Sequence, residues 1–442
     1  MKRIQLSDHF TWKRILLFSL PSIGVQLVSN TYQVADGYFI SNFINSSAFA
    51  AENLIFPPIA ILASIGLMFG SGASALISQK IGEGKRQAAN QLFTFTISVL
   101  LIAGILCSAL LLLVLPYIAQ LVGADEGLLP YCVEYGRILL ICMPFLMLSC
   151  AFYPLMIVAE RPGLGLAVSI INAVSNIVLD WLLIAELKLG MTGAALATGL
   201  SWIIRALISL VFFMNRSNPV HFEQIKTDWK AIAGICYNGA SEMVDAISYS
   251  IIAVLFNLML VKLAGENGVS AYAVTEYVTG IFTAVFFGIG MSITPVVGYH
   301  LGEKNLSEIK SLLKNGILLT GVIGIFMTLF SVVFAGSISR FFVGYNSELT
   351  SMSVEALNIV SLSFLITGIT TFSSSYFTGL GDGTASLVIS ALKSFLIPLI
   401  GILLFSHLWG LRGIWIIPLV SEIIALVFAF IFIKHSRKKM IL

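Results

Sequence analysis

Residues 92–116 read LFTFTISVLLIAGILCSALLLLVLP and contain no charged side chain. A membrane-spanning α-helix needs about 20 consecutive, predominantly apolar residues, so this stretch is long enough to cross a bilayer. The whole chain has a matching composition, with 58% hydrophobic residues, 11% charged residues and a mean hydropathy of +0.96. Soluble globular proteins carry about 25% charged residues. The sequence therefore predicts an all-α polytopic membrane protein.

Other stretches of similar length and composition precede and follow this one. The first lacks a signal-peptidase cleavage pattern, so we expect it to be retained as a span. Together they predict twelve transmembrane helices, at residues 15–40, 53–78, 92–116, 132–158, 164–185, 192–214, 232–262, 270–299, 313–335, 354–378, 385–406 and 411–433.

The positions of the 25 Lys and Arg residues predict the orientation. Cytoplasmic loops of membrane proteins carry an excess of these residues. Twelve spans place both termini on the same side of the membrane. If that side is cytoplasmic, most of the basic residues face the cytoplasm, and only Lys188, Lys262, Arg340 and Arg412 lie on the outer side. We therefore expect a multi-pass protein of the inner (plasma) membrane with both termini in the cytoplasm.

The chain contains an internal repeat at an offset of 220 residues. Ile81-Gly82-Glu83 corresponds to Leu301-Gly302-Glu303, Gly70 to Gly290, and the pair Gly190 and Gly193 to Gly410 and Gly413. Each half then holds an even number of spans, so both halves enter the membrane in the same direction. We predict two pseudo-symmetric six-helix bundles, an N-lobe (1–218) and a C-lobe (219–442), with a central cavity between them.

Several short motifs resemble the multidrug and toxic compound extrusion (MATE) family. They are Leu20-Pro21, Asp36-Gly37, QKIGEGK at 79–85, NIVLD at 176–180 and GAALAT at 193–198. The resemblance extends over the whole chain in span number, span order and duplication. It implies a secondary-active antiporter that exports organic, cationic, amphipathic compounds or drugs in exchange for H⁺ or Na⁺.

Two carboxylates lie inside predicted spans of the first half, where an ionised side chain is costly and is a functional candidate by default. Asp36 shares a helix face with Tyr32, and Asp180 shares one with Asn172 and Asn176, because residues four apart are neighbours on a helix. Such a carboxylate can bind Na⁺ with neutral oxygen ligands, or take a proton because burial disfavours its charged form. A purely structural hydrogen bond between helices is the alternative.

Within the family, the set resembles the N-lobe cation site of the DinF-like branch. That resemblance adds Thr198 and implies coupling through Tyr32, Asp36, Asn176, Asp180 and Thr198, with Na⁺ as a possible ligand of Asp36, Asn176 and Asp180. The 220-residue offset places Phe256, Leu396, Ile400 and Pro418 at the positions of Asp36, Asn176, Asp180 and Thr198. We therefore expect the cation site in the N-lobe only.

The second half has its own polar positions. Glu242, Asp245 and Tyr249 follow one another on one helix face, and Glu276 lies in the next span. The family resemblance places these helices beside the cavity, so we predict that the four residues contact a cationic substrate. For Glu242 and Asp245, a solvated stripe near the cytoplasmic surface is an equally good interpretation. Lys393 is also embedded, and we expect it to form an ion pair with Glu422.

Other function classes find less support. A lipid-linked substrate flippase of the same superfamily remains an alternative, but such proteins have basic cavities, whereas the embedded residues here are mostly acidic. A membrane-embedded enzyme would need a catalytic motif such as HExxH, and a channel would need a selectivity filter. We expect no enzymatic activity, no cofactor besides the coupling ion and no nucleic-acid partner. We predict a monomer that contacts membrane lipids and an organic small molecule.

Overall fold

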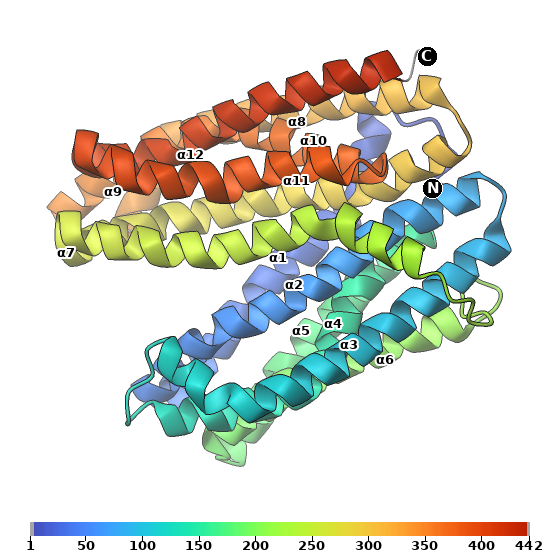
Figure 1. Ribbon diagram of the computed structural model, residues 1–442. Helices are drawn as coiled ribbons and strands as arrows, with labels where there is room; N and C mark the ends of the chain where they lie inside the picture. Colours follow the sequence, from blue (N-terminus) through green and yellow to red (C-terminus); the bar gives the residue numbers. More distant parts are fainter. Residues whose placement is uncertain (1–3, 440–442) are drawn as a thin grey trace. The chain divides into compact units, whose positions relative to one another are not determined.

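The computed structural model describes residues 4–439, with side chains up to residue 436, and the regular secondary structure of this part of the chain is helical. Figure 1 shows the helices in chain order. They are α1 (Trp12–Phe43), α2 (Ser46–Gly82), α3 (Arg86–Leu121), α4 (Leu129–Val158), α5 (Pro162–Asp180), η1 (Trp181–Glu186), α6 (Gly190–Met214), α7 (Trp229–Gly302), α8 (Leu306–Val343), α9 (Ser347–Val360), η2 (Ser361–Ser363), α10 (Phe364–Gly379), α11 (Gly383–Ala391), η3 (Leu392–Leu396) and α12 (Ile397–Lys439).

Ten continuous helical segments among residues 4–439 are long and apolar enough to cross a membrane. Two of them are long enough for two crossings. Helix α7 is interrupted at Gly265, and α12 at Gly410, where the backbone adopts φ of 59° and 58°. Only glycine adopts this conformation without steric cost. Counted on either side of these breaks, the segments number twelve, which is the number of spans that the sequence predicts.

Contacts divide the chain into two compact units. One contains Gly24–Gly239 and the start of the chain up to Leu6, and the other contains Ser7–Ile23 and the chain from Ala240 onward. The first turns of α1 thus pack with the second unit, where the Phe10 amide donates to Glu308 Oε1 at 2.7 Å. The first turns of α7 pack with the first unit, since Gly239 contacts the Met68 backbone.

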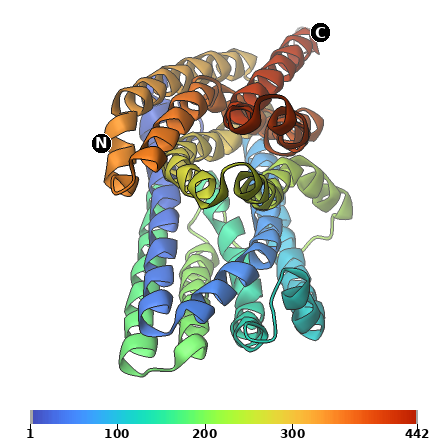
Figure 2. The same ribbon diagram turned by 90° about the vertical axis from the view of Figure 1, so that its left-hand side faces the viewer.

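Helix α4 is the central helix of the first unit and packs against α2, α3, α5 and α6. Figures 1 and 2 show these helices, coloured blue to green, running side by side. A Cβ atom at Gly70 of α2 would lie 2.7 Å from Ala151 Cα of α4, so only glycine permits this close approach. In the second unit, α10 packs against α8, α11 and α12.

Positions related by the 220-residue offset have the same local conformation. Gly190 and Gly410 both have φ of 58°, and Gly84 (φ 78°) corresponds to Lys304 (φ 60°). Gly290 of α7 abuts Ser375 of α10, as Gly70 abuts α4. The repeat seen in the sequence is therefore also a repeat of turns and of helix contacts.

Candidate functional site

The polar residues predicted in the first half lie at a common depth. With a helical rise of about 1.5 Å per residue, Asp36 lies about 10 Å from the end of α1, and Asp180 about 9 Å from the end of η1. Thr198 lies about 12 Å from the start of α6 by the same rise. These helix ends all belong to one end of an up-and-down bundle, so the three side chains gather in one layer.

Hydrogen bonds connect three of the predicted residues. Thr198 Oγ1 donates to Asp36 Oδ2 at 3.4 Å, and Asn176 Nδ2 donates to Thr198 Oγ1 at 3.4 Å. All three side chains are buried. Helices α1, α5 and α6 are thereby joined at this layer, as the sequence predicted for Asp36, Asn176 and Thr198.

Asp180 faces Asp36, and the two carboxyl groups interact with each other. Asp180 is fully buried and Asp36 is 5% exposed. Within the described part of the chain, no donor reaches Asp36 Oδ1 or either carboxylate oxygen of Asp180. Two adjacent carboxyl groups with three such oxygens need a shared proton or a bound cation, because buried, unsatisfied anionic oxygens are costly.

Tyr32 and Asn172 lie deeper along the same helices. Tyr32 is within electrostatic range of Asp36 and of Arg205 on α6. Asn172 is buried, two turns before Asp180, and no described residue donates to its Oδ1. These two residues extend the polar layer, but no hydrogen bond joins them to Asp36 or Asp180 among the described contacts.

Glu52 and Tyr135 belong to the same layer and were missed by the sequence analysis. They lie about 9 Å from the starts of α2 and α4. Glu52 interacts electrostatically with both Asp36 and Asp180, and its buried Oε2 finds no donor among the described residues. Tyr135 is 4% exposed and is placed among the carboxyl groups. The sequence could have indicated them, because Glu52 and Tyr135 each lie six residues after the start of their helix and so reach the same depth as Asp36 and Asp180.

This arrangement suits a proton or a monovalent cation. The described residues contain no group of three or more His, Cys, Asp or Glu side chains that converges as metal ligands do, so Glu52 flanks the Asp36–Asp180 pair and does not complete a three-carboxylate site. Carboxylate, amide and hydroxyl oxygens are the hard ligands that alkali and alkaline-earth ions prefer. The same oxygens can equally hold a proton between two carboxyl groups.

A second charged cluster lies in the second unit. Lys393 Nζ is 3.6 Å from Asp245 Oδ2 and donates to Thr371 Oγ1 at 3.1 Å. Glu422 instead accepts a hydrogen bond from Thr370 Oγ1 at 2.5 Å. The sequence analysis therefore named the wrong partner for Lys393, which forms its ion pair with Asp245 and not with Glu422. The π-helical turn η3 presents Lys393 toward α7, where Asp245 is the nearest carboxylate.

Glu276 and Tyr249 form a separate group. Tyr249 Oη donates to Glu276 Oε2 at 3.1 Å. Tyr272 stacks between Phe256 and Trp415, with ring centroids 5.4 and 6.5 Å away. The four residues predicted for substrate contact thus fall into two groups, one around Lys393 and one beside an aromatic stack. A carboxylate beside aromatic rings suits an organic cation.

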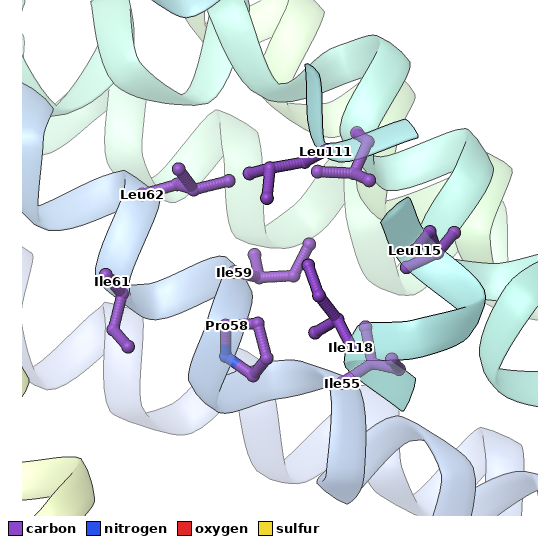
Figure 3. Close-up of a pocket in the computed structure, with 9 residues that line it drawn as sticks. Ile55, Pro58, Ile59, Ile61, Leu62, Leu111, Leu115 and Ile118 are labelled. Carbon is purple, nitrogen blue, oxygen red and sulfur yellow. The ribbon is translucent and has the colours of Figure 1, made fainter. Parts of the chain in front are cut away.

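An apolar cavity of about 220 Å³ lies between α2, α3 and α4, with Leu140 of α4 among its lining residues. Figure 3 shows Ile, Leu and Pro side chains around it. The lining residues are Ile55, Pro58, Ile59, Ile61, Leu62, Leu111, Leu115, Ile118 and Leu140. No charged group lines this cavity, so it suits neither an ion nor a cationic compound by itself.

A protein-family comparison matches the MatE model twice along the chain, at residues 21–182 and 243–404. Together the two matches cover more than half of the chain. They fall in the two halves defined by the repeat, at an offset close to the 220 residues read from the sequence.

Curated relatives are multidrug exporters. The chain is 26% identical over 426 residues to the multidrug export protein MepA of Staphylococcus aureus (strain NCTC 8325 / PS 47), covering 94% of this chain and 92% of the relative. It is 23% identical to MepA of Staphylococcus haemolyticus over 434 residues, covering 97% and 94%.

Solved structures have the same fold. An outward-facing multidrug resistance MATE transporter of the MOP superfamily superposes with a TM-score of 0.91 at 22% identity, covering 100% of this chain and 99% of the other. A MOP superfamily transporter from Pyrococcus furiosus superposes with a TM-score of 0.90 at 22% identity and the same coverage. These likenesses support a twelve-helix fold with two lobes.

Proposed function

The chain belongs to the MatE family, and from that premise we propose that it is a secondary-active antiporter that exports organic, cationic, amphipathic compounds or drugs in exchange for H⁺ or Na⁺. Its family consists of membrane transporters and not enzymes. The names of its curated relatives support multidrug export as the activity.

The coupling ion binds in the polar layer of the first half, in a site like that of the DinF-like branch. The carboxyl groups of Asp36 and Asp180 bind and release the coupling ion. Neutral oxygen ligands come from Asn176, Thr198, Tyr32 and Asn172. The observation that carries this proposal is the buried pair of carboxyl groups, in which only Asp36 Oδ2 receives a hydrogen bond from a described donor, and the other three oxygens receive none. A proton or Na⁺ would satisfy these oxygens, and its departure would leave two repelling charges in a buried layer.

The substrate binds to acidic residues of the second half. Glu242 and Asp245 attract a positive charge from one group, and Glu276 with Tyr249 from the other, beside aromatic rings that can contact an organic cation. Residues 1–218 and 219–442 act as N-lobe and C-lobe around a central cavity. The transporter works as a monomer in the plasma membrane with both termini in the cytoplasm.

The test is efflux of a cationic dye from proteoliposomes that contain the purified full chain, driven in separate experiments by a pH gradient and a Na⁺ gradient. Asp36→Asn and Asp180→Asn are expected to abolish coupled efflux while dye binding without a gradient persists. Glu186→Gln is a matched control, since Glu186 is exposed at the end of η1, the helical continuation of the helix that carries Asp180.

The two gradients also identify the coupling ion, because only the gradient of that ion drives efflux. Dye efflux that responds to neither gradient would refute the antiporter. Full coupled efflux by both Asp variants would refute the site and leave the antiporter intact.

A further inference from the structure

The charged cluster of the second unit consists of Lys393, Asp245, Glu242 and Glu422, and its positive charge is the ammonium group of Lys393. Lys393 lies on η3, within a membrane-spanning helix, and its side chain is 11% exposed. A Lys at such a depth is costly and needs compensating anionic or polar partners. Its partner Asp245 remains 24% exposed, so the cluster is accessible on the Asp245 side.

Asp245 does not depend on Lys393 for its hydrogen bonds. Ser394 Oγ donates to Asp245 Oδ1 at 2.5 Å, and Ser390 Oγ donates to Asp245 Oδ2 at 3.0 Å. The separation of 3.6 Å between Lys393 Nζ and Asp245 Oδ2 is longer than a direct charge-assisted hydrogen bond. The ammonium donates to Thr371 Oγ1 and is held beside Asp245 mainly by charge. Another cation could therefore replace it without breaking a short hydrogen bond to Asp245.

Acidic groups outnumber the ammonium. Glu242 and Glu422 also interact electrostatically with Lys393. Glu422 has its own hydroxyl donor in Thr370, as Asp245 has in Ser390 and Ser394. Three carboxyl groups thus lie within electrostatic range of a single positive charge, with several hydroxyl groups beside them. They do not converge as metal ligands do, but their charge favours a monovalent cation, and in the structure the side chain of Lys393 is that cation.

We propose that Lys393 is a tethered competitor of the cationic substrate and sets the affinity of the second-half cluster for organic monocations. The substrate's positive charge takes the place of the ammonium beside Asp245, and Lys393 then turns toward Glu422 and Glu242. This inference rests on the proposed function, because it requires that the cluster contacts the exported cation. It assigns Lys393 the role of a specificity-determining residue.

The competition has a consequence for transport. A site with three carboxyl groups and no internal cation would hold a monocation tightly and release it slowly. A like charge on a flexible side chain lowers the affinity and supplies a replacement partner for the carboxylates as the substrate leaves. A neutral compound gains no electrostatic binding energy by displacing Lys393 from Asp245. The residue therefore affects the binding of charged substrates selectively.

The test measures equilibrium binding of tetraphenylphosphonium, a lipophilic monocation, to the full chain in nanodiscs without any ion gradient. Lys393→Met, which keeps the length of the side chain and removes its charge, is expected to bind the probe at least about tenfold more tightly. Lys393→Arg keeps the charge and is expected to bind it within about threefold of the unaltered chain. Binding of the neutral dye Nile red is expected to stay unchanged in both variants.

Unchanged or weaker binding of tetraphenylphosphonium by folded Lys393→Met would overturn the proposal, and so would an equal gain for Nile red. If Lys393→Met does not fold, the comparison moves to the Asp245→Asn background, where the buried ammonium has lost its partner. The variant Asp245→Asn/Lys393→Met must then bind tetraphenylphosphonium more tightly than Asp245→Asn alone, because Glu242 and Glu422 remain. Equal affinities of these two variants for tetraphenylphosphonium would refute the proposal. These binding measurements need no ion gradient. A negative result in them therefore refutes the role of Lys393, whereas absence of gradient-driven efflux by the unaltered chain refutes the proposed antiport.

Discussion

Replacing Asp245 with Asn should destabilise the second unit far more than breaking an exposed ion pair does. The substitution keeps the shape of the side chain and removes its charge. It leaves Lys393, which is 11% exposed, without its ion-pair partner. An exposed pair serves as the comparison, because Arg412 Nε and Glu355 Oε1 lie 2.5 Å apart with side chains that are 77% and 39% exposed.

The magnitude follows from distance and burial. At 3.6 Å and an effective dielectric constant of about 20, opposite unit charges attract by about 4 to 5 kcal/mol. Removing one partner of a buried pair costs about 3 to 5 kcal/mol, because the remaining charge is left uncompensated. An exposed pair contributes about 0 to 1 kcal/mol. At about 2 °C per kcal/mol, Asp245→Asn should lower the apparent melting temperature by about 6 to 10 °C, and Glu355→Gln by about 2 °C or less.

Thermal unfolding of purified protein in one detergent, followed by intrinsic fluorescence, measures both shifts. The double variant Asp245→Asn/Lys393→Met removes both charges and should recover at least half of the loss, since replacing a whole buried pair is often close to neutral. Equal shifts for Asp245→Asn and Glu355→Gln would refute the reasoning. So would a double variant that is no more stable than Asp245→Asn alone.

Three further changes test other parts of the structure. Glu52→Gln is expected to reduce gradient-driven dye efflux about tenfold without changing dye affinity, whereas Leu111→Ala in the apolar cavity should leave efflux within about twofold; full efflux by Glu52→Gln would remove Glu52 from the site. Lys304→Gly should raise the stability by about 1 kcal/mol, since Lys304 has φ of 60°, and an unchanged melting temperature would contradict that account. Gly70→Leu should cost about 3 kcal/mol or more through contact with the Ala151 backbone, seen as loss of monodisperse protein in size-exclusion chromatography, and a normal elution profile would show that the helices can separate at no cost.

Most of the fold followed from the sequence because lipid allows few backbone solutions. Each span must satisfy its own hydrogen bonds, so the length of an apolar run defines a helix. The all-helical, polytopic fold was confirmed, and the number of twelve helices is supported by the likeness to solved structures. Gly265 and Gly410 separate helices where loops were expected. The membrane orientation and the central cavity stay predictions, because they concern the bilayer and the relation of the two halves.

Helical spacing predicted only part of the candidate site, namely the shared helix face of Asn172, Asn176 and Asp180. The contact of Asp36, Asn176 and Thr198 was implied by the family resemblance, and the structure brings these three side chains together. Glu52 was missed because the predicted span began at residue 53, whereas α2 begins at Ser46, capped by the Asn45 side chain. The polar first turns of α2 lower its hydropathy and conceal that Glu52 is inside a helix.

The contact between Lys393 and Asp245 could not be read from spacing along one helix. It joins η3 to α7 across a large separation in sequence, and its choice of Asp245 over Glu422 depends on the rotation of a single helical turn. A sequence pattern gives the face of a regular α-helix, but it does not predict where a π-helical turn alters that face.

The π-helical turns bear on how the two halves diverged after duplication. One, η1, directly follows Asp180, and the other, η3, carries Lys393; both lie in the fifth helix of their half. A π-helical turn absorbs one extra residue, so side chains within the turn change their direction while the helix beyond it continues. Single-codon insertions at different points of two copies can therefore give each copy its own inward-facing side chains at one turn while the number of its helices stays the same. By that route, one ancestral helix could become the proton or sodium partner in one copy and the carrier of a resident ammonium in the other.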